Sequence, residues 1–139
     1  MALDAEAIID QLQLAAHPEG GWFRETWRDE ASTAIWFLLR PGERSGWHRV
    51  HGSAEVWHHY LGDALTLLVS TDGVDVTSTT LGADLGAGER PQLVVPGGAW
   101  QSAEPLAGRP CGYTLVGCTV SPPFRFDAFE LAPRGWQPG

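Results

Sequence analysis

The chain has 139 residues, a formal net charge of -8 and no lysine. A chain of this length forms one domain with its own hydrophobic core. The negative charge argues against nucleic-acid binding, which depends on clustered Lys and Arg, and the lack of lysine excludes Schiff-base and P-loop chemistry.

The first residues, MALDAEAIID, carry acidic side chains where a signal peptide carries basic ones. No apolar run approaches the ~18 residues that cross a bilayer. Cys111 and Cys118 fall in one predicted strand, too far apart along it to form a disulfide. We therefore expect a soluble, cytoplasmic protein with reduced cysteines.

Residues 1–16 predict an N-terminal helical segment. Asp4 is a suitable N-cap, the residues after it favour a helix, and apolar residues recur at helical spacing. We expect the helix to end at His17-Pro18, because a residue that precedes proline avoids the α region.

The rest of the chain predicts short strands separated by turns. Strands are predicted, in chain order, at residues 21–28, 32–39, 45–50, 55–61, 64–70, 74–80, 93–95, 112–120 and 126–131. Asp72-Gly73 predicts a hairpin. Residues 81–89 are glycine-rich but lack the ending of a phosphate-binding loop, so we interpret them as turns. Residues 133–139 predict an irregular tail, and the whole pattern predicts an all-β sandwich or jelly roll.

The segment of residues 40–62 contains Gly42, His48, Glu55 and Gly62 at the spacing of the first cupin motif. The chain resembles the cupin superfamily, and within it the cupin-5 (DUF985-type) subfamily. The blocks that carry this resemblance are residues 17–26, 32–39, 48–58, 94–101 and 117–131. The resemblance implies a single cupin domain over residues 1–139, folded as a double-stranded β-helix (a jelly-roll barrel) with a short N-terminal helix.

The chain departs from the general cupin pattern at two expected metal ligands. Val50 and Gln101 stand where that pattern implies histidines. Valine cannot bind a metal, and an amide oxygen is a weaker ligand for Zn or Fe than an imidazole. We therefore expect no cofactor and at most weak binding of a divalent metal, for which the ligands would be His48, Glu55, His59 and Gln101.

The alternation of side chains along the strands indicates which residues face the candidate pocket. Residues two apart on a strand share a face, so Trp57 and His59 should point inward if Glu55 does. The alternative is that His48 and Glu55 form a hydrogen-bonded pair inside a packed barrel. We favour a ligand pocket, because a buried carboxylate without a partner is costly.

Other side chains are candidates for binding or catalysis. Arg24 could clamp a carboxylate or phosphate, or could instead form a salt bridge with Glu25. Trp57, Trp100 and Gln101 are expected in the pocket wall. Tyr113 is the candidate acid, and Tyr60 is a weaker one; for either, a packed side chain with a bonded hydroxyl is the alternative.

Three functions fit the sequence. The first is a small-molecule-binding cupin. Its resemblance to sugar epimerases of the same fold implies a metal-independent isomerase or epimerase with His48 as base, Glu55 as its orienting partner and a sugar-like or carboxylated ligand. The second is a metal-dependent oxygenase or isomerase that uses His48, Glu55 and His59. The third is a non-catalytic, storage-like or structural β-sandwich.

Two further expectations concern the pocket and the surface. In a water-filled pocket, ionised Glu55 raises the pKa of His48, which favours an anionic or hydroxyl-rich ligand. The strands at residues 22–28 and 32–39 are too apolar for a solvated face, so we expect a homodimer that covers them, with a dimeric mass in solution.

Overall fold

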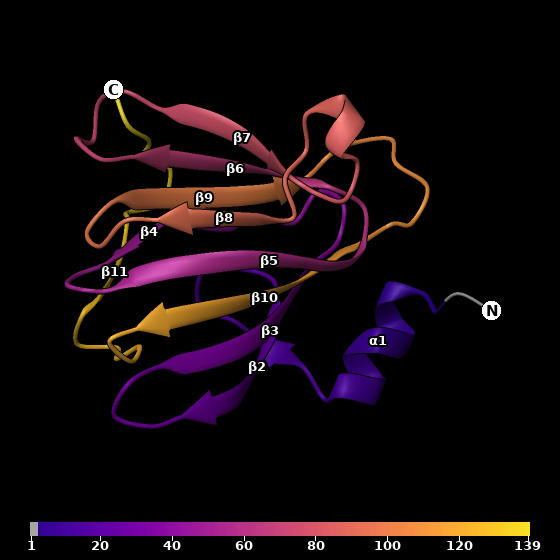
Figure 1. Cartoon of the computed structure of the whole chain (residues 1–139), viewed down its shortest axis with the longest axis horizontal. Helices are drawn as coiled ribbons and strands as arrows, with labels where there is room; N and C mark the ends of the chain where they lie inside the picture. Colours follow the sequence, from indigo (N-terminus) through magenta and orange to yellow (C-terminus); the bar gives the residue numbers. More distant parts are fainter. Residues whose placement is uncertain (1–2) are drawn as a thin grey trace.

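Two antiparallel β-sheets pack face to face in the computed structural model, which describes residues 3–139 (Figure 1). One sheet contains, in spatial order, β1 (Ala15–Ala16), β2 (Trp22–Arg28), β3 (Thr33–Leu39), β10 (Thr114–Ser121), β5 (Ala54–Gly62) and β8 (Gln92–Val95). The other contains β11 (Phe129–Leu131), β4 (Ser45–Val50), β9 (Trp100–Pro105), β6 (Leu65–Ser70) and β7 (Thr77–Leu81). The chain crosses repeatedly between the sheets, which confirms the predicted all-β jelly roll.

The main hydrophobic core lies between the two sheets. Phe37 and Trp57 enter it from the six-stranded sheet, and Leu65 and Leu67 enter it from the five-stranded sheet; none is more than 1% exposed. Burial of each such side chain is worth about 1.5–3 kcal/mol. Phe23 is partly buried at the edge of this core, where the core gives way to a cavity.

The N-terminal helix α1 (Ala5–Leu12) packs against the outer face of the six-stranded sheet (Figure 1). Asp4 caps it, as predicted, by accepting the N–H of Ala7 at 2.8 Å. The predicted end at His17 is wrong. Gln13 takes a left-handed conformation with φ of 56°, so the helix stops there and Ala15–Ala16 pairs with β2.

Strand β9 is the main element that the sequence did not predict. Its residues include Gln101 and Ser102, which are polar but fully buried between β4 and β6. Ser, Ala, Glu and Pro are poor strand formers by composition, so sheet pairing and burial rather than propensity decide this element. The hairpin at Asp72-Gly73 is confirmed by the pairing of β6 with β7.

The six-stranded sheet has a partly open edge. Strand β1 pairs only with Trp22 and Phe23 of β2, and Trp27 further along β2 is 57% exposed. The homodimer remains a prediction, and a measurement of the mass of the protein in solution would test it. Within residues 3–139, no helix is long and apolar enough to span a membrane.

Candidate functional site

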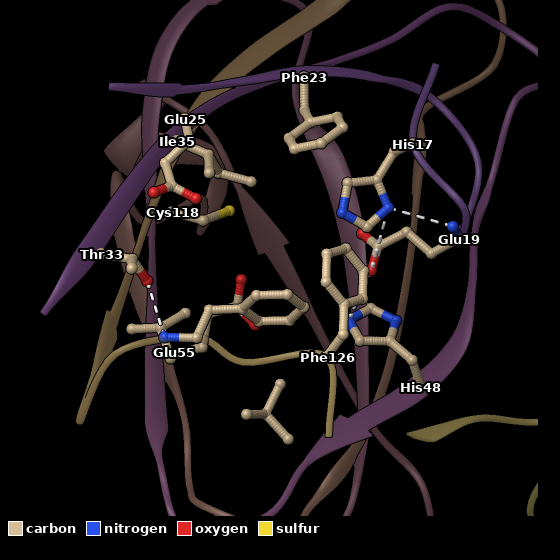
Figure 2. Close-up of a pocket in the computed structure, with 13 residues that line it drawn as sticks. His17, Glu19, Phe23, Glu25, Thr33, Ile35, His48, Glu55, Cys118 and Phe126 are labelled. Atoms are coloured by element: carbon tan, nitrogen blue, oxygen red, sulfur yellow. Dashed lines mark hydrogen bonds and ion pairs between the residues drawn. The ribbon is translucent and has the colours of Figure 1, made fainter. Parts of the chain in front are cut away.

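A cavity of about 50 Å³ lies between the sheets, beside the main core (Figure 2). Strands β2, β3, β4, β5 and β10 form its walls, together with the turn at residues 17–19 and the loop that carries Phe124 and Phe126. The lining residues are His17, Glu19, Phe23, Glu25, Thr33, Ile35, His48, Val50, Glu55, Cys118, Val120, Phe124 and Phe126. Figure 2 shows His17, Glu19 and His48 together on one side of the cavity.

The Glu19 Oε2 and His48 Nε2 atoms lie 3.1 Å apart, in direct polar contact. The other ring nitrogen, His48 Nδ1, lies 2.7 Å from the Gly46 carbonyl oxygen, to which it donates. Ser45 Oγ donates to Glu19 Oε1 at 2.9 Å. These contacts form a chain in which every polar atom of Glu19 and His48 has a partner.

Glycine makes the position of Glu19 attainable. Gly20 has φ of 106°, and a Cβ at this residue would collide with the carbonyl oxygen of Arg44. Only glycine tolerates this combination of left-handed backbone and close approach. The resulting turn lies against β4, where the Gly46 N–H donates to the Glu19 carbonyl at 2.6 Å, and this contact aims the Glu19 side chain at His48.

Glu55 lies in a separate hydrogen-bond network. Gln101 Nε2 donates to Glu55 Oε1 at 2.8 Å, and Trp57 Nε1 donates to Gln101 Oε1 at 2.8 Å. The Cys118 thiol also lines the cavity and favours the ionised form of Glu55. The Glu55 carboxylate therefore has a buried polar partner, as an ionised group requires.

The two buried carboxyl groups have different pKa values. Burial raises the pKa of Glu19 to about 8, and the hydrogen bond from Ser45 offsets this only in part. Burial also raises the pKa of Glu55, to about 6; His48 and the donors beside Glu55 favour its ionised form and limit this rise, whereas the nearby Glu19 adds to it. At pH 7, Glu19 therefore carries a proton and Glu55 is mostly ionised.

The two histidines of the cavity are neutral at pH 7. Burial lowers the pKa of His48, although Glu55 and the Gly46 carbonyl raise it. Burial, followed by the proximity of His48, lowers the pKa of His17 to about 4. His17 Nδ1 accepts the N–H of Glu19 at 3.1 Å, so its proton lies on Nε2. His48 Nδ1 carries the ring proton, which it donates to the Gly46 carbonyl, so His48 Nε2 is the acceptor that faces protonated Glu19 across their 3.1 Å contact.

Two expectations about His48 are corrected by this geometry. The carboxyl group in direct contact with His48 is that of Glu19, whereas Glu55 acts on His48 only through its charge. The pKa of His48 is lowered rather than raised, because His48 is only 2% exposed and the cost of burying its charge exceeds the attraction of Glu55. His48 is therefore neutral and does not supply the positive charge that was expected to bind an anionic ligand.

The structure brings some predicted site residues together at the cavity. His48 and Glu55 line it, and Gln101 lies behind Glu55 as its hydrogen-bond donor. Trp57 is a core residue that holds Gln101 in place. Trp57 and Gln101 thus support the cavity from behind instead of forming its surface.

Other predicted site residues lie elsewhere. Arg24 points away from the cavity and donates to Gln13 at 3.2 Å. Tyr113 belongs to the cluster beneath α1. Trp100 contacts Trp136, with ring centroids 4.6 Å apart, outside the cavity lining. The alternation of the strands could not reveal these positions, because it assigns a face but not a distance along the strand.

His59 shows the same limit of strand alternation. It follows Glu55 by four residues, which corresponds to about 13 Å along a strand. It lines a separate cavity of about 240 Å³ with Asp63 and Arg109, and its Nε2 atom lies 3.2 Å from the Gly62 carbonyl oxygen. His59 and Glu55 therefore do not line one cavity.

Four ionisable residues of the cavity were not predicted as site residues: His17, Glu19, Glu25 and Cys118. A sequence signal existed for the first three, since all three lie in the block at residues 17–26. Glu25 forms an ion pair with Arg28 at 2.7 Å, so its partner is Arg28 and not Arg24. Glu19 also lines a larger, open groove of about 890 Å³ with Trp47, Arg134 and Trp136.

The side chains at the cavity do not suit a metal ion. Val50 lines the cavity where the general pattern implies a histidine, and both polar atoms of the Gln101 amide are engaged by Glu55 and Trp57. Within residues 3–139, no group of three or more His, Cys, Asp or Glu side chains has the arrangement of a metal site.

Comparisons with known proteins agree with the fold. The family model described as "Cupin superfamily (DUF985)" matches residues 6–132. The structure of protein SO0799 from Shewanella oneidensis is 39% identical, with a TM-score of 0.87 over 94% of this chain and 85% of that chain. A hypothetical protein from Leishmania major is 35% identical, with a TM-score of 0.85 over 94% of this chain and 88% of that one.

One curated relative and one distant structure complete the comparison. Uncharacterized protein YML079W from Saccharomyces cerevisiae is 31% identical over 70% of this chain, and the match spans only 59% of that protein's length. A dTDP sugar isomerase from Desulfovibrio desulfuricans is 14% identical, with a TM-score of 0.63 over 88% of each chain. At that identity the likeness concerns the fold alone.

Proposed function

Because this chain belongs to the Cupin_5 (DUF985) family of the cupin superfamily, we propose that its interior cavity is the active site of a metal-independent isomerase or epimerase. The proposed substrate is a small carbonyl compound with a neighbouring hydroxyl group. One observation carries the proposal: two buried carboxyl groups border one cavity with pKa values of about 6 and about 8. Environments that separate the pKa values of two such groups assign one as base and the other as acid.

Glu55 is the proposed base. It is ionised at pH 7, and its pKa near 6 is close enough to neutrality for it to take a proton and return it. It would remove a proton from the carbon next to the carbonyl group. Gln101 holds the carboxylate in one orientation, and this orientation limits the substrate geometry from which it can take a proton.

Glu19 is the proposed acid. It carries a proton at pH 7, and it would give that proton to the carbonyl oxygen while Glu55 removes the carbon-bound proton. Neutral His48 orients Glu19 through their 3.1 Å contact. This assignment replaces the roles of His48 as base and Tyr113 as acid, because Tyr113 lies beneath α1.

The distant likeness to a dTDP sugar isomerase supports the proposal only weakly. It indicates that a jelly roll of this shape can carry isomerase chemistry, but function resides in the site and not in the fold. The metal-dependent alternative is disfavoured by Val50 and by the engaged amide of Gln101. A non-catalytic binding protein is the remaining alternative, and turnover decides between it and the isomerase.

The test is deuterium incorporation from solvent. Hydroxyacetone, dihydroxyacetone and glyceraldehyde are incubated with the protein in D₂O, and NMR follows the protons next to each carbonyl group. We expect exchange that rises with pH as Glu55 ionises near 6 and falls as Glu19 ionises near 8. Glu55→Gln should abolish it. Glu130→Gln is the control, because Glu130 pairs with Arg49 and His51 on the surface.

Exchange with none of the three compounds above the buffer rate would contradict the proposal. Exchange that persists unchanged in Glu55→Gln would contradict the assignment of the base.

Metal content is a separate prediction. The purified protein is expected to hold far less than one equivalent of Fe, Mn or Zn after dialysis, as measured by elemental analysis, because the site lacks two imidazoles. The matched variant carries both Val50→His and Gln101→His and is expected to retain more metal. One equivalent in the unmodified protein, lost in His48→Ala, would overturn the prediction and favour the metal-dependent alternative.

A further inference from the structure

The interior cavity has one polar side and one apolar side. His17, Glu19, His48 and Glu55 supply the polar side, whereas Phe23, Ile35, Val50, Val120, Phe124 and Phe126 supply apolar surface. A ligand that matches both sides has oxygen atoms at one end and hydrocarbon at the other. A sugar, which carries a hydroxyl group on nearly every carbon, would leave hydroxyls against the apolar side without partners.

The charge of the cavity disfavours anions. None of its lining residues is an arginine, and the chain has no lysine. Glu55 is ionised, and Glu25 is paired with Arg28, whose side chain is 46% exposed at the surface. A carboxylate or phosphate group in the cavity would meet a like charge in a buried setting without a neutralising cation.

The volume sets the size of the ligand. A cavity of about 50 Å³ has room for only a few water molecules, since each needs on the order of 10–15 Å³ measured in this way. Cavities that hold drug-sized ligands are about 300–1,000 Å³. Phe126 lines the cavity (Figure 2). It is 62% exposed to solvent, so its movement would admit a somewhat larger ligand.

We propose that the ligand is a small uncharged α-hydroxycarbonyl compound with an alkyl end, of the size of hydroxyacetone or lactaldehyde. This proposal rests on the proposed function, because it assumes that the proton-transfer site and the ligand site are the same cavity.

The reaction for this class is the interconversion of hydroxyacetone and lactaldehyde. Glu55 takes a proton from the carbon that bears the hydroxyl group, the electron pair forms a carbon–carbon double bond, and the carbonyl oxygen takes the proton of Glu19. In the second step the other hydroxyl returns its proton to Glu19, and Glu55 returns a proton to the former carbonyl carbon. The product is an isomer of the substrate, so no oxidant or cofactor is consumed.

Val50 is the residue by which this selectivity can be tested. It lies two residues after His48 on β4, lines the cavity and is only 3% exposed. Threonine has nearly the same shape as valine but carries a hydroxyl group. Val50→Thr therefore adds one hydrogen-bonding group to the apolar side with little change of volume.

The experiment measures binding, so that it does not depend on turnover. Ligand-observed saturation-transfer NMR compares hydroxyacetone with dihydroxyacetone, glycerate and glyceraldehyde 3-phosphate. We expect hydroxyacetone to bind most tightly to the unmodified protein. Val50→Thr should shift the preference toward dihydroxyacetone by about fivefold, as one added hydrogen bond allows. Val94→Thr, at an exposed position on β8, should leave the preference for hydroxyacetone unchanged.

Tighter binding of glycerate or glyceraldehyde 3-phosphate, or no binding of hydroxyacetone, would overturn the inference. If Val50→Thr fails to fold, the order of affinities of the four compounds for the unmodified protein still tests the proposed ligand class. Exchange of dihydroxyacetone without hydroxyacetone binding rejects the ligand class and leaves the isomerase standing. Hydroxyacetone binding without any exchange supports the ligand class and rejects the isomerase.

Discussion

Replacement of Glu19 by glutamine is expected to stabilise the protein at pH 8 and above, and to leave its stability at pH 5 nearly unchanged. Glu19 has a pKa of about 8 in the folded chain, against an ordinary value of 4.5. Between these values the unfolded chain releases a proton that the folded chain keeps, so the stability that Glu19 contributes is complete below pH 4.5 and declines as pH rises to 8. Each unit of pKa difference corresponds to about 1.4 kcal/mol, so the decline amounts to several kcal/mol.

Glutamine removes this decline because it cannot ionise in either state. Its amide nitrogen can donate to His48 Nε2 and its oxygen can accept from Ser45, as protonated Glu19 does. Urea unfolding of both proteins at several pH values between 5 and 9 measures the effect. His17 acts in the opposite direction, since its lowered pKa makes stability fall below pH 6.5 toward about 4, but it contributes equally to both proteins and cancels in the difference.

Glu130→Gln is the control for this measurement, because its carboxylate lies at the surface between Arg49 and His51. Stability curves that run parallel for Glu19→Gln and the unmodified protein over the whole pH range would show that Glu19 ionises normally. The assignment of Glu19 as the acid would then fail with the prediction.

Gln101→Leu is expected to destabilise the protein by about 2–5 kcal/mol, the largest loss we expect from one neutral substitution near the cavity. Gln101 is only 1% exposed and satisfies two buried groups, Trp57 Nε1 and Glu55 Oε1. Leucine has a similar size but leaves both groups without this partner. Chemical denaturation at pH 7 measures the loss, and the pKa of Glu55 should rise further above its usual range.

Gln92→Leu is the matched control, because Gln92 is an exposed glutamine on β8. It should change the free energy of unfolding by no more than about 0.5 kcal/mol. A loss below 1 kcal/mol for Gln101→Leu would mean that water or a neighbouring side chain replaces the amide. Gln101 would then not be needed to orient Glu55.

The cavity was only partly predictable from the sequence. The spacing of His48 and Glu55 indicated that both contribute to one site, and the alternation of β4 placed Val50 beside His48 on the same wall. Glu19 could not be placed in this way, because it lies in a turn whose path depends on the contact of Gly20 with β4. A turn has no periodicity from which the direction of a side chain can be inferred.

The direction of the His48 pKa shift could not be predicted from the sequence, for another reason. It depends on the balance between burial and the charge of Glu55, and the degree of burial becomes known only when the two sheets are assembled. The fold itself was more accessible, since hydrophobic runs and turn residues mark most strands. Strand β9 was missed because its buried residues, Gln101 and Ser102, are polar.

Glu19 borders two spaces, the small interior cavity and the open groove beside Trp136. If Glu19 is the acid, it can recover a proton from water in the groove while the cavity stays filled by ligand. Glu19 would then regain its proton before the product leaves the cavity. The proton for the next turnover would arrive through the groove and not by the path that the substrate takes. The Glu19 carboxyl group would thus separate the path of protons from the path of substrate and product.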